Sequence, residues 1–266
     1  MGLGRLVQAL LGRLPGRQAG SSRARHGPAE PPARHLAYFE LRDALDAPGC
    51  PVCRLAEEAV EAAQRSLLHE NVNDPGVRAG LARSGGFCRE HAWRLRQHRD
   101  LLGVAILHRD LVSRFRDGLA PNGPARSRCP ACTERDETAR AAIGILAQGF
   151  SDPEIRRRFE ASDGLCRDHF EWARAAWGAR PAGLEAAQAA CLARLVGQLD
   201  ELIRKHDYRF SDEPVGEEGD SALRGIAAVS GLDVAALPRP RSRKLPPDRE
   251  GPRPGSLDAG GAGGDH

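Results

Sequence analysis

The sequence has few aromatic residues and almost no lysine. Phe, Trp and Tyr make up 5% of the 266 residues, and the only lysines are Lys205 and Lys244. The abundant residues Ala, Leu and Arg are strong helix formers, so the composition favours helices. The formal net charge of +3 is small for this length. It does not indicate a dedicated nucleic-acid-binding protein, in which a basic face is expected.

Long apolar runs are also missing, and none approaches the roughly 20 residues that a membrane-spanning helix needs. The segment MGLGRLVQALLGRL is apolar only between Arg5 and Arg13, which is too short for a secretory signal. Its leucines have helical spacing, so it is either a weak amphipathic helix at a membrane surface or, more simply, a peripheral segment. We therefore expect a cytoplasmic protein, whose cysteines are metal ligands or reactive thiols rather than disulfides.

Six of the seven cysteines belong to a pattern that occurs twice. CPVC is followed by CREH, and CPAC is followed by CRDH. The second and third cysteines of a set are 35 positions apart in the first copy (53 to 88) and 34 in the second (132 to 166). The residues involved are Cys50, Cys53, Cys88 and His91, then Cys129, Cys132, Cys166 and His169.

The duplication extends beyond these eight residues. NDPGVRAGLARSGGFC (73–88) aligns with SDPEIRRRFEASDGLC (151–166), and the two share Asp-Pro, a β-branched residue before Arg, and Gly two positions before Cys. A repeat of this quality indicates two homologous units.

Helical periodicity is present in each unit, and no convincing alternating strand pattern occurs anywhere, so the predicted fold is all-α with two homologous helical units. After each C-P-x-C, apolar residues recur on one helical face. Asp-Pro then begins a short helix, a Gly-containing pair breaks it, and C-x-x-H begins the next helix. A long helix closes each unit, at 101–115 and 183–206. The two apolar faces consist of Ala56, Val60, Ala63 and Leu67, and of Ala139, Ala142, Ile143 and Leu146.

Three thiolates and one imidazole form a common structural zinc site, so the sequence predicts two zinc ions per chain. Sulfurs three positions apart can converge on one ion, and residues three apart share a face of a helical turn. Both kinds of pair lie at predicted helix N-termini, where free N–H groups favour the thiolate over the thiol. Less favoured interpretations are redox-active C-P-x-C pairs and buried thiols that only fill the core.

The spacing leaves open which pairs share an ion. Sequential pairing joins Cys50–Cys53 to Cys88–His91 and Cys129–Cys132 to Cys166–His169. Interleaved pairing joins each C-x-x-C to the C-x-x-H of the other unit. We favour sequential pairing, because a duplicated unit is expected to keep its own site.

Five other residues near the motifs have simpler expected roles. Cys191 is expected to be a small core residue rather than a ligand or nucleophile. Trp93 and Trp172 follow the two C-x-x-H motifs and are expected to pack beside the metal. Glu90 and Asp168 lie in the first helical turn, where matching the helix dipole is a more plausible role than acid catalysis.

The chain resembles a family of bacterial proteins of unknown function, with two C-P-x-C motifs, two Gly-x-Cys-x-x-His motifs and a downstream Asp-Tyr-Arg segment, here DYRF at 207–210. The resemblance covers roughly residues 36–235; it implies a helical, zinc-bound protein and no known reaction. The predicted divisions are a flexible basic segment, the first unit, the second unit, an acidic turn-rich segment with a short helix, and a disordered Pro/Gly-rich tail. Their bounds are 1–35, 36–120, 121–210, 211–236 and 237–266.

Three functions fit these features. The first is a non-enzymatic zinc-stabilised helical module that binds a protein partner, because four protein ligands leave no coordination position for a substrate or water. The second is a nucleic-acid-binding regulator that uses Arg-rich helices. The third is a redox sensor whose C-P-x-C thiolates are oxidised and release zinc. A hydrolytic metalloenzyme is less favoured, because it would need a displaced ligand.

Overall fold

We analysed a computed structural model, which describes residues 36–118, 127–176, 183–210 and 212–231. These residues form ten α-helices and three short 3₁₀ helices, with no strand among them, so the predicted all-α fold is confirmed. The terminal segments 1–35 and 237–266 lie outside the described residues. The helices are α2 (Leu36–Leu45), α3 (Pro51–His69), α4 (Pro75–Arg83), α5 (Arg89–Arg94), α6 (Leu101–Asp117), α7 (Pro130–Gly149), α8 (Pro153–Ala161), α9 (Arg167–Ala176), α10 (Leu184–Lys205) and α11 (Ser221–Ser230).

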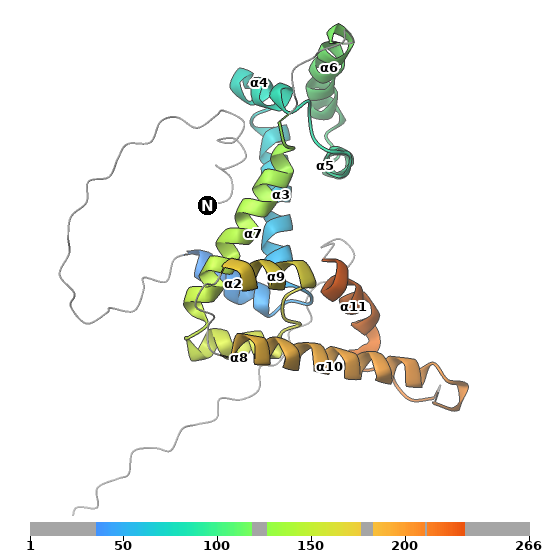
Figure 1. The fold of residues 1–266 in the computed structure, drawn as a ribbon. Coiled ribbons are helices and arrows are strands. Elements are labelled where there is room, and N and C mark those ends of the chain that lie inside the picture. The colour runs from blue at the N-terminus through green and yellow to red at the C-terminus, as the bar shows by residue number, and fades with distance from the viewer. Residues whose placement is uncertain (1–35, 119–126, 177–182, 211, 232–266) are drawn as a thin grey trace, which may run out of the picture.

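Helices α3 and α7 form the long axis of the molecule and make its most extensive helix–helix contact (Figure 1). They run antiparallel: Val52 near the start of α3 shares a core cluster with Leu146, near the end of α7. The two helices have 19 and 20 residues, so each is about 30 Å long at 1.5 Å per residue. The two predicted apolar faces are confirmed, since every one of their residues is at most 2% exposed.

The two cores differ greatly in size. The larger surrounds the start of α3 and the end of α7, where α2, α8, α9, α10 and α11 pack (Figure 1). The smaller has seven buried residues and lies at the other end, where α4, α6 and the 3₁₀ helix η1 (Leu95–His98) cover the last turns of α3. The smaller core consists of residues from the first sequence unit, whereas the larger one includes residues from both units.

Local sequence explains how the helices begin. Cys50 and Cys129 are N-cap residues, and each is followed by Pro in the first turn, where the missing N–H is not needed. Asp74 and Asp152 cap α4 and α8 by accepting hydrogen bonds from backbone N–H groups of Val77 and Glu154. The predicted short helices after Asp-Pro are therefore present in both units.

The C-terminal part of the described chain folds back on the larger core. The last three residues of DYRF form the 3₁₀ helix η2 (Tyr208–Phe210), and the acidic segment contains η3 (Glu217–Asp220) before α11. Within α11, Arg224 is only 2% exposed, and its guanidinium donates to the buried Asp163 carboxylate at 3.1 Å. Asp163 also accepts from the Gly49 backbone N–H at 2.7 Å. One carboxylate thus connects α11 to the loop before Cys50.

Candidate metal centres

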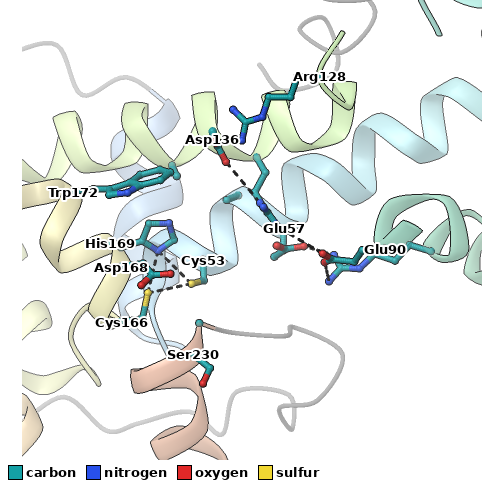
Figure 2. Close-up of a pocket in the computed structure, with 15 residues that line it drawn as sticks. Cys53, Glu57, Glu90, Arg128, Asp136, Cys166, Asp168, His169, Trp172 and Ser230 are labelled. Carbon is teal, nitrogen blue, oxygen red and sulfur yellow. Dashed lines mark hydrogen bonds and ion pairs between the residues drawn. The ribbon is translucent and has the colours of Figure 1, made fainter. Parts of the chain in front are cut away.

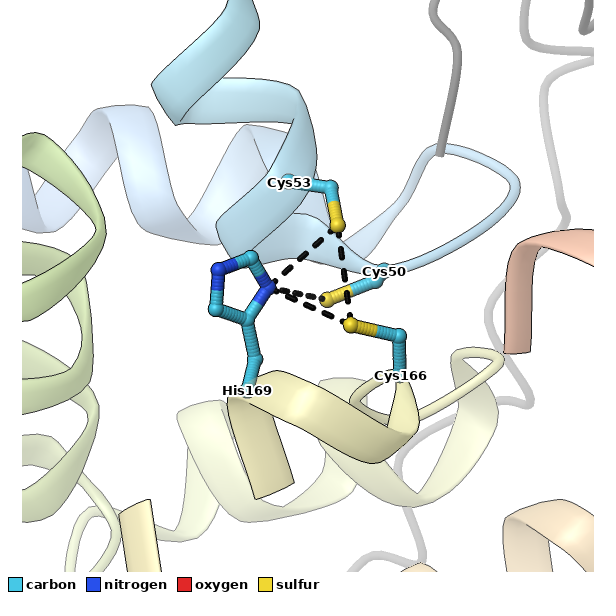
Figure 3. A group of neighbouring side chains, drawn as sticks. All are labelled: Cys50, Cys53, Cys166 and His169. Carbon is cyan, nitrogen blue, oxygen red and sulfur yellow. Dashed lines mark hydrogen bonds between the residues drawn. The ribbon is translucent and has the colours of Figure 1, made fainter. Parts of the chain in front are cut away.

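Site I is a compact group of three sulfurs and one imidazole at the end of the molecule with the larger core. The start of α3 contributes Cys50 and Cys53, and the start of α9 contributes Cys166 and His169 (Figure 3). The His169 Nδ1 atom lies 3.6, 3.3 and 3.3 Å from the sulfurs of Cys50, Cys53 and Cys166. All three sulfurs therefore face the same ring nitrogen.

Site II repeats this arrangement at the opposite end of the α3–α7 pair. Here the start of α5 contributes Cys88 and His91, and the start of α7 contributes Cys129 and Cys132. The His91 Nδ1 atom lies 3.1, 3.8 and 3.4 Å from the sulfurs of Cys88, Cys129 and Cys132. In each site all four candidate ligand atoms lie within 4.8 Å of one another.

The predicted sequential pairing is wrong, because each C-P-x-C meets the C-x-x-H of the other unit. The reason is the length of the intervening helix. Within one unit, C-P-x-C lies at the start of a helix about 30 Å long, and the chain reaches C-x-x-H only after the far end of that helix. Antiparallel packing of α3 and α7 then places the start of each long helix beside the C-x-x-H of the other unit.

The spacing of the sulfurs fits a tetrahedral ion. The Sγ atoms of Cys53 and Cys166 are 3.7 Å apart, as are those of Cys88 and Cys132. With Zn–S bonds of about 2.3 Å, tetrahedral geometry places two sulfurs roughly 3.8 Å apart. A disulfide bond is much shorter, at about 2.05 Å, and these cysteines are free thiols. The residues present therefore suit a Cys₃His metal centre.

The protonation equilibria of site II favour a neutral imidazole and differ between its thiols. Burial lowers the pKa of His91 to about 4, which keeps the ring neutral as a metal ligand must be. Burial raises the pKa of the Cys88 thiol, but hydrogen bonds with the His91 backbone N–H group and with the Cys132 and Cys129 side chains outweigh it, and the net shift is downward. Burial and the neighbouring Cys129 raise the pKa of Cys132 to about 12, because several thiolates crowded together repel one another. A cation at the centre would relieve this repulsion.

In site I, the pKa shifts also show that the clustered sulfurs favour a positive charge beside them. Burial strongly raises the pKa of Cys50. Burial opposes a charged His169, yet hydrogen bonds with the sulfurs of Cys166 and Cys53 raise the pKa of its ring to about 10. Hydrogen bonds with the Cys50 and Cys53 side chains lower the pKa of the Cys166 thiol. The pocket thus stabilises a positive charge held among its sulfurs, which is what a bound metal cation supplies.

A charged cleft of about 500 Å³ lies beside site I (Figure 2). Cys53, Cys166 and His169 of site I line it, together with side chains around site II. Across the cleft, a series of ion pairs runs from α3 through α5 to α7. Arg94 of α5 pairs with Glu57 of α3 and, at 3.2 Å, with Glu90. Arg135 of α7 lies 3.9 Å from Glu90 and 3.8 Å from Asp136, and Asp136 pairs with Arg128 at 2.5 Å.

The residues expected near the motifs have different fates. Cys191 is 1% exposed, as expected of a core residue, and its thiol donates to the Phe159 carbonyl at 3.3 Å. Trp172 packs edge-on against His169, with ring centroids 5.5 Å apart. The same expectation is wrong for Trp93, which is 68% exposed. Glu90 occupies the first turn of α5 as expected, but it also joins the charged series across the cleft.

Sequence reasoning missed the buried Arg224–Asp163 pair that positions α11 over site I. An arginine in a short segment of mixed polarity carries no local signal of burial in an Arg-rich chain. The only available signal was Asp163, which directly precedes the Gly of the second Gly-x-Cys-x-x-His motif.

Among the described residues, no helix is long and apolar enough to cross a membrane. One relative, described as an uncharacterized 23.9 kDa protein in the xynA 3′ region of Caldicellulosiruptor sp. (strain Rt8B.4), is 37% identical over 67 residues. That match covers 25% of this chain and 32% of the relative, so the two are comparable over about a third of the relative's length. No solved structure gives a significant match. Residues 33–126 and 124–235 each match the family of unknown function DUF6062, so the chain belongs to this family and contains its characteristic region twice.

Proposed function

We propose that this chain is a non-enzymatic, zinc-stabilised helical protein of the cytoplasm that acts as a protein-interaction or regulatory module. The observation that carries the proposal is the interleaved ligand set. Each site takes two ligands from each sequence unit, so two bound ions would cross-link the units at both ends of the α3–α7 pair.

A structural rather than catalytic role follows from the number of ligands. Each site supplies three thiolates and one imidazole, which satisfy four-coordinate zinc without a water molecule. A catalytic zinc site keeps one position open for water or substrate. The carboxylates nearest the ligands have other partners or positions: Glu90 pairs with Arg94 and Arg135, and Asp168 lies in the first turn of α9.

The stabilising effect of zinc would be greatest at the end with the smaller core. Only seven buried residues form that core, which gives limited apolar burial to offset the ordering of α4, α5 and α6. A zinc ion in site II would fix the start of α5 to the start of α7. Because the unfolded chain does not present a preformed site, the free energy of metal binding stabilises the fold directly.

A protein partner is supported by apolar side chains on the outer face of α10. Leu192, Val196 and Ile203 are 39%, 54% and 70% exposed and recur at helical spacing. Beside them, Ala189 and Ala193 are exposed and would let a partner helix approach closely. An apolar face of this kind is typical of helix-mediated recognition.

Metal analysis of untagged protein tests the zinc assignment. We expect two zinc ions per chain by mass spectrometry under native conditions, and X-ray absorption with a mean shell of three sulfurs and one nitrogen. Chelation should lower the helix signal in circular dichroism and the unfolding temperature. Protein that is fully folded without any metal would overturn the proposal.

Site-specific photo-crosslinking in cells tests the partner assignment. A photoreactive residue at Val196, on the apolar face of α10, should give a discrete crosslinked protein. The same residue at the exposed Glu137 of α7 is the matched control and should give none. Equal labelling from both positions, or none from Val196, would contradict a partner that binds α10.

A further inference from the structure

The two metal centres differ in how well their sulfurs are shielded. In site I, Cys50, Cys53 and Cys166 are 2%, 7% and 1% exposed. In site II, Cys88, Cys129 and Cys132 are all partly exposed. The two sites have the same ligand types at similar distances, so exposure is the main difference between their sulfurs.

Helix α11 packs beside site I and contributes to its burial. Its Ala227 is buried in the larger core, and Gly231, just after the helix, lies so close to site I that an added Cβ would be 3.8 Å from the Cys53 sulfur. The buried Arg224–Asp163 pair fixes the helix in this position. Over the described residues, the first unit has no helix corresponding to α11 after its closing helix α6.

The second ring nitrogen of the site II imidazole also lacks a hydrogen-bond acceptor among the described residues. With Nδ1 directed at the sulfurs, the proton of His91 resides on Nε2, which is buried and has no hydrogen-bond partner within the described part of the chain. Metal-bound histidines ordinarily donate this N–H to an acceptor, and losing that acceptor typically weakens metal binding about 10- to 100-fold. His169 of site I is only partly buried, so its second nitrogen is not confined in this way.

We infer that site II is an oxidation-sensitive zinc–thiolate centre that reacts with hydrogen peroxide, whereas site I keeps its metal. This inference depends on the proposed zinc binding. A site II thiolate attacks the peroxide, the O–O bond breaks, and the sulfur becomes a sulfenic acid as one hydroxide leaves. A second site II thiolate then attacks that sulfur, an S–S bond forms, and a second hydroxide leaves. Two electrons pass from two sulfurs to one peroxide, and the zinc ion is released.

The geometry of site II suits the second step. The Sγ atoms of Cys132 and Cys88 are 3.7 Å apart, and all candidate ligand atoms of site II lie within 4.8 Å of one another. A second thiolate is therefore close enough to attack an oxidised sulfur. Exposure of the sulfurs admits the oxidant, and thiol oxidation is selective for such accessible thiolates. Site I has similarly close sulfurs, but its three cysteines are at most 7% exposed.

The test uses the full chain loaded with two zinc ions and treated with hydrogen peroxide. A chromogenic chelator should report one zinc released at least about tenfold faster than the other. Mapping of peptides after the fast phase should find a disulfide joining Cys132 to Cys88 or Cys129, with Cys50, Cys53 and Cys166 still reduced.

The variant Arg224→Ala provides a second, independent test in the same zinc-release experiment. Removing the guanidinium frees α11 from Asp163, so the slow zinc should be released faster while the fast phase is unchanged. Cys191→Ser is the matched control, because Cys191 belongs to neither site, and should leave both phases unchanged. Release of both ions together in the wild type, or first oxidation in site I, would overturn the inference alone. A chain that binds no zinc would overturn the proposed function instead.

Discussion

The Sγ atom of Cys53 lies 3.7 Å from the Sγ atom of Cys166, although 113 positions separate the two residues. Cys132 and Cys88 repeat this relationship at the other end of the α3–α7 pair, at the same distance. Each pair joins the start of a long helix to the start of a short one from the other sequence unit. Each candidate metal centre therefore contains ligands from both sequence units, and the two units contact each other at both centres.

Double cysteine variants distinguish this interleaved pairing from sequential pairing by counting metal ions. Cys53 and Cys166 belong to one site, so Cys53→Ser with Cys166→Ser should lose one zinc and keep one. Cys53→Ser with Cys88→Ser removes a ligand from each site and should lose both. Sequential pairing predicts the opposite pattern. Mass spectrometry under native conditions reads the stoichiometry, and Cys191→Ser serves as a control that should retain two.

Removing one partner of the buried Arg224–Asp163 pair should strongly lower the free energy of unfolding. Arg224→Ala leaves the Asp163 carboxylate buried without its cation, which typically costs about 3–5 kcal/mol. Arg65→Ala removes an exposed i,i+4 pair with Glu61 and should cost about 0.3–0.5 kcal/mol. Urea denaturation at saturating zinc measures both. Equal effects of the two variants would refute the importance of burial here.

The ligands could be predicted from the sequence because their evidence is local and duplicated. Cys88 and His91 recur as Cys166 and His169, and the Gly two positions before each Cys recurs as well. Both glycines have positive φ, +98° at Gly86 and +72° at Gly164, a conformation that breaks the preceding helix as expected. The buried faces of α3 and α7 were predictable for the same reason, because helical periodicity is a local signal.

The pairing of the ligands could not be read from local signals, because it depends on how α3 and α7 pack. The length of α3 does separate Cys53 from Cys88, but spacing alone does not identify the partner helix. The different fates of Trp93 and Trp172 have a similar origin. Their positions in the repeat are nearly equivalent, yet α7 supplies Arg140 beside the ring of Trp172, whereas Trp93 remains exposed.

The two Asp-Pro helix starts should differ in their contribution to stability. Asp74 caps α4 by accepting from the Val77 N–H at 2.7 Å, and Asp74→Ala should cost about 1 kcal/mol. Asp152 caps α8 and also accepts from the Tyr38 hydroxyl at 2.6 Å, which ties α2 to α8. Asp152→Ala should therefore cost about 2–3 kcal/mol, since a hydrogen bond to a charged acceptor adds about 1.5 kcal/mol or more.

Tyr38→Phe completes a double-mutant cycle with Asp152→Ala. We expect the double variant to be more stable than the sum of the single effects allows, because both variants remove the same hydrogen bond. Equilibrium denaturation with zinc held at saturation supplies all values. Strict additivity would show that the Tyr38–Asp152 contact contributes nothing to the free energy of unfolding.

Gly164 should be intolerant of a side chain for two reasons that act together. Its φ of +72° is unfavourable for any residue with a Cβ, and an added Cβ would lie 2.7 Å from the Gln188 Oε1 atom. The Gln188 side chain cannot easily move, because it is 3% exposed and its amide pairs with both the N–H and the carbonyl of Leu165, at 2.8 and 2.9 Å. Gly164→Ala should therefore cost about 2–3 kcal/mol.

The matched control is Gly197→Ala on the exposed face of α10. A Cβ there meets nothing within 4 Å, so alanine should stabilise the helix by about 0.5–1 kcal/mol. Combining Gly164→Ala with Gln188→Ala removes the clash but not the backbone strain, so the clash component should disappear from the double variant.

Because Gly164 lies two positions before Cys166, Gly164→Ala should also weaken zinc binding at site I and leave site II unchanged, as measured by competition with a chelator. A Gly164→Ala protein with wild-type stability and two tightly bound zinc ions would show that this turn does not position the ligand.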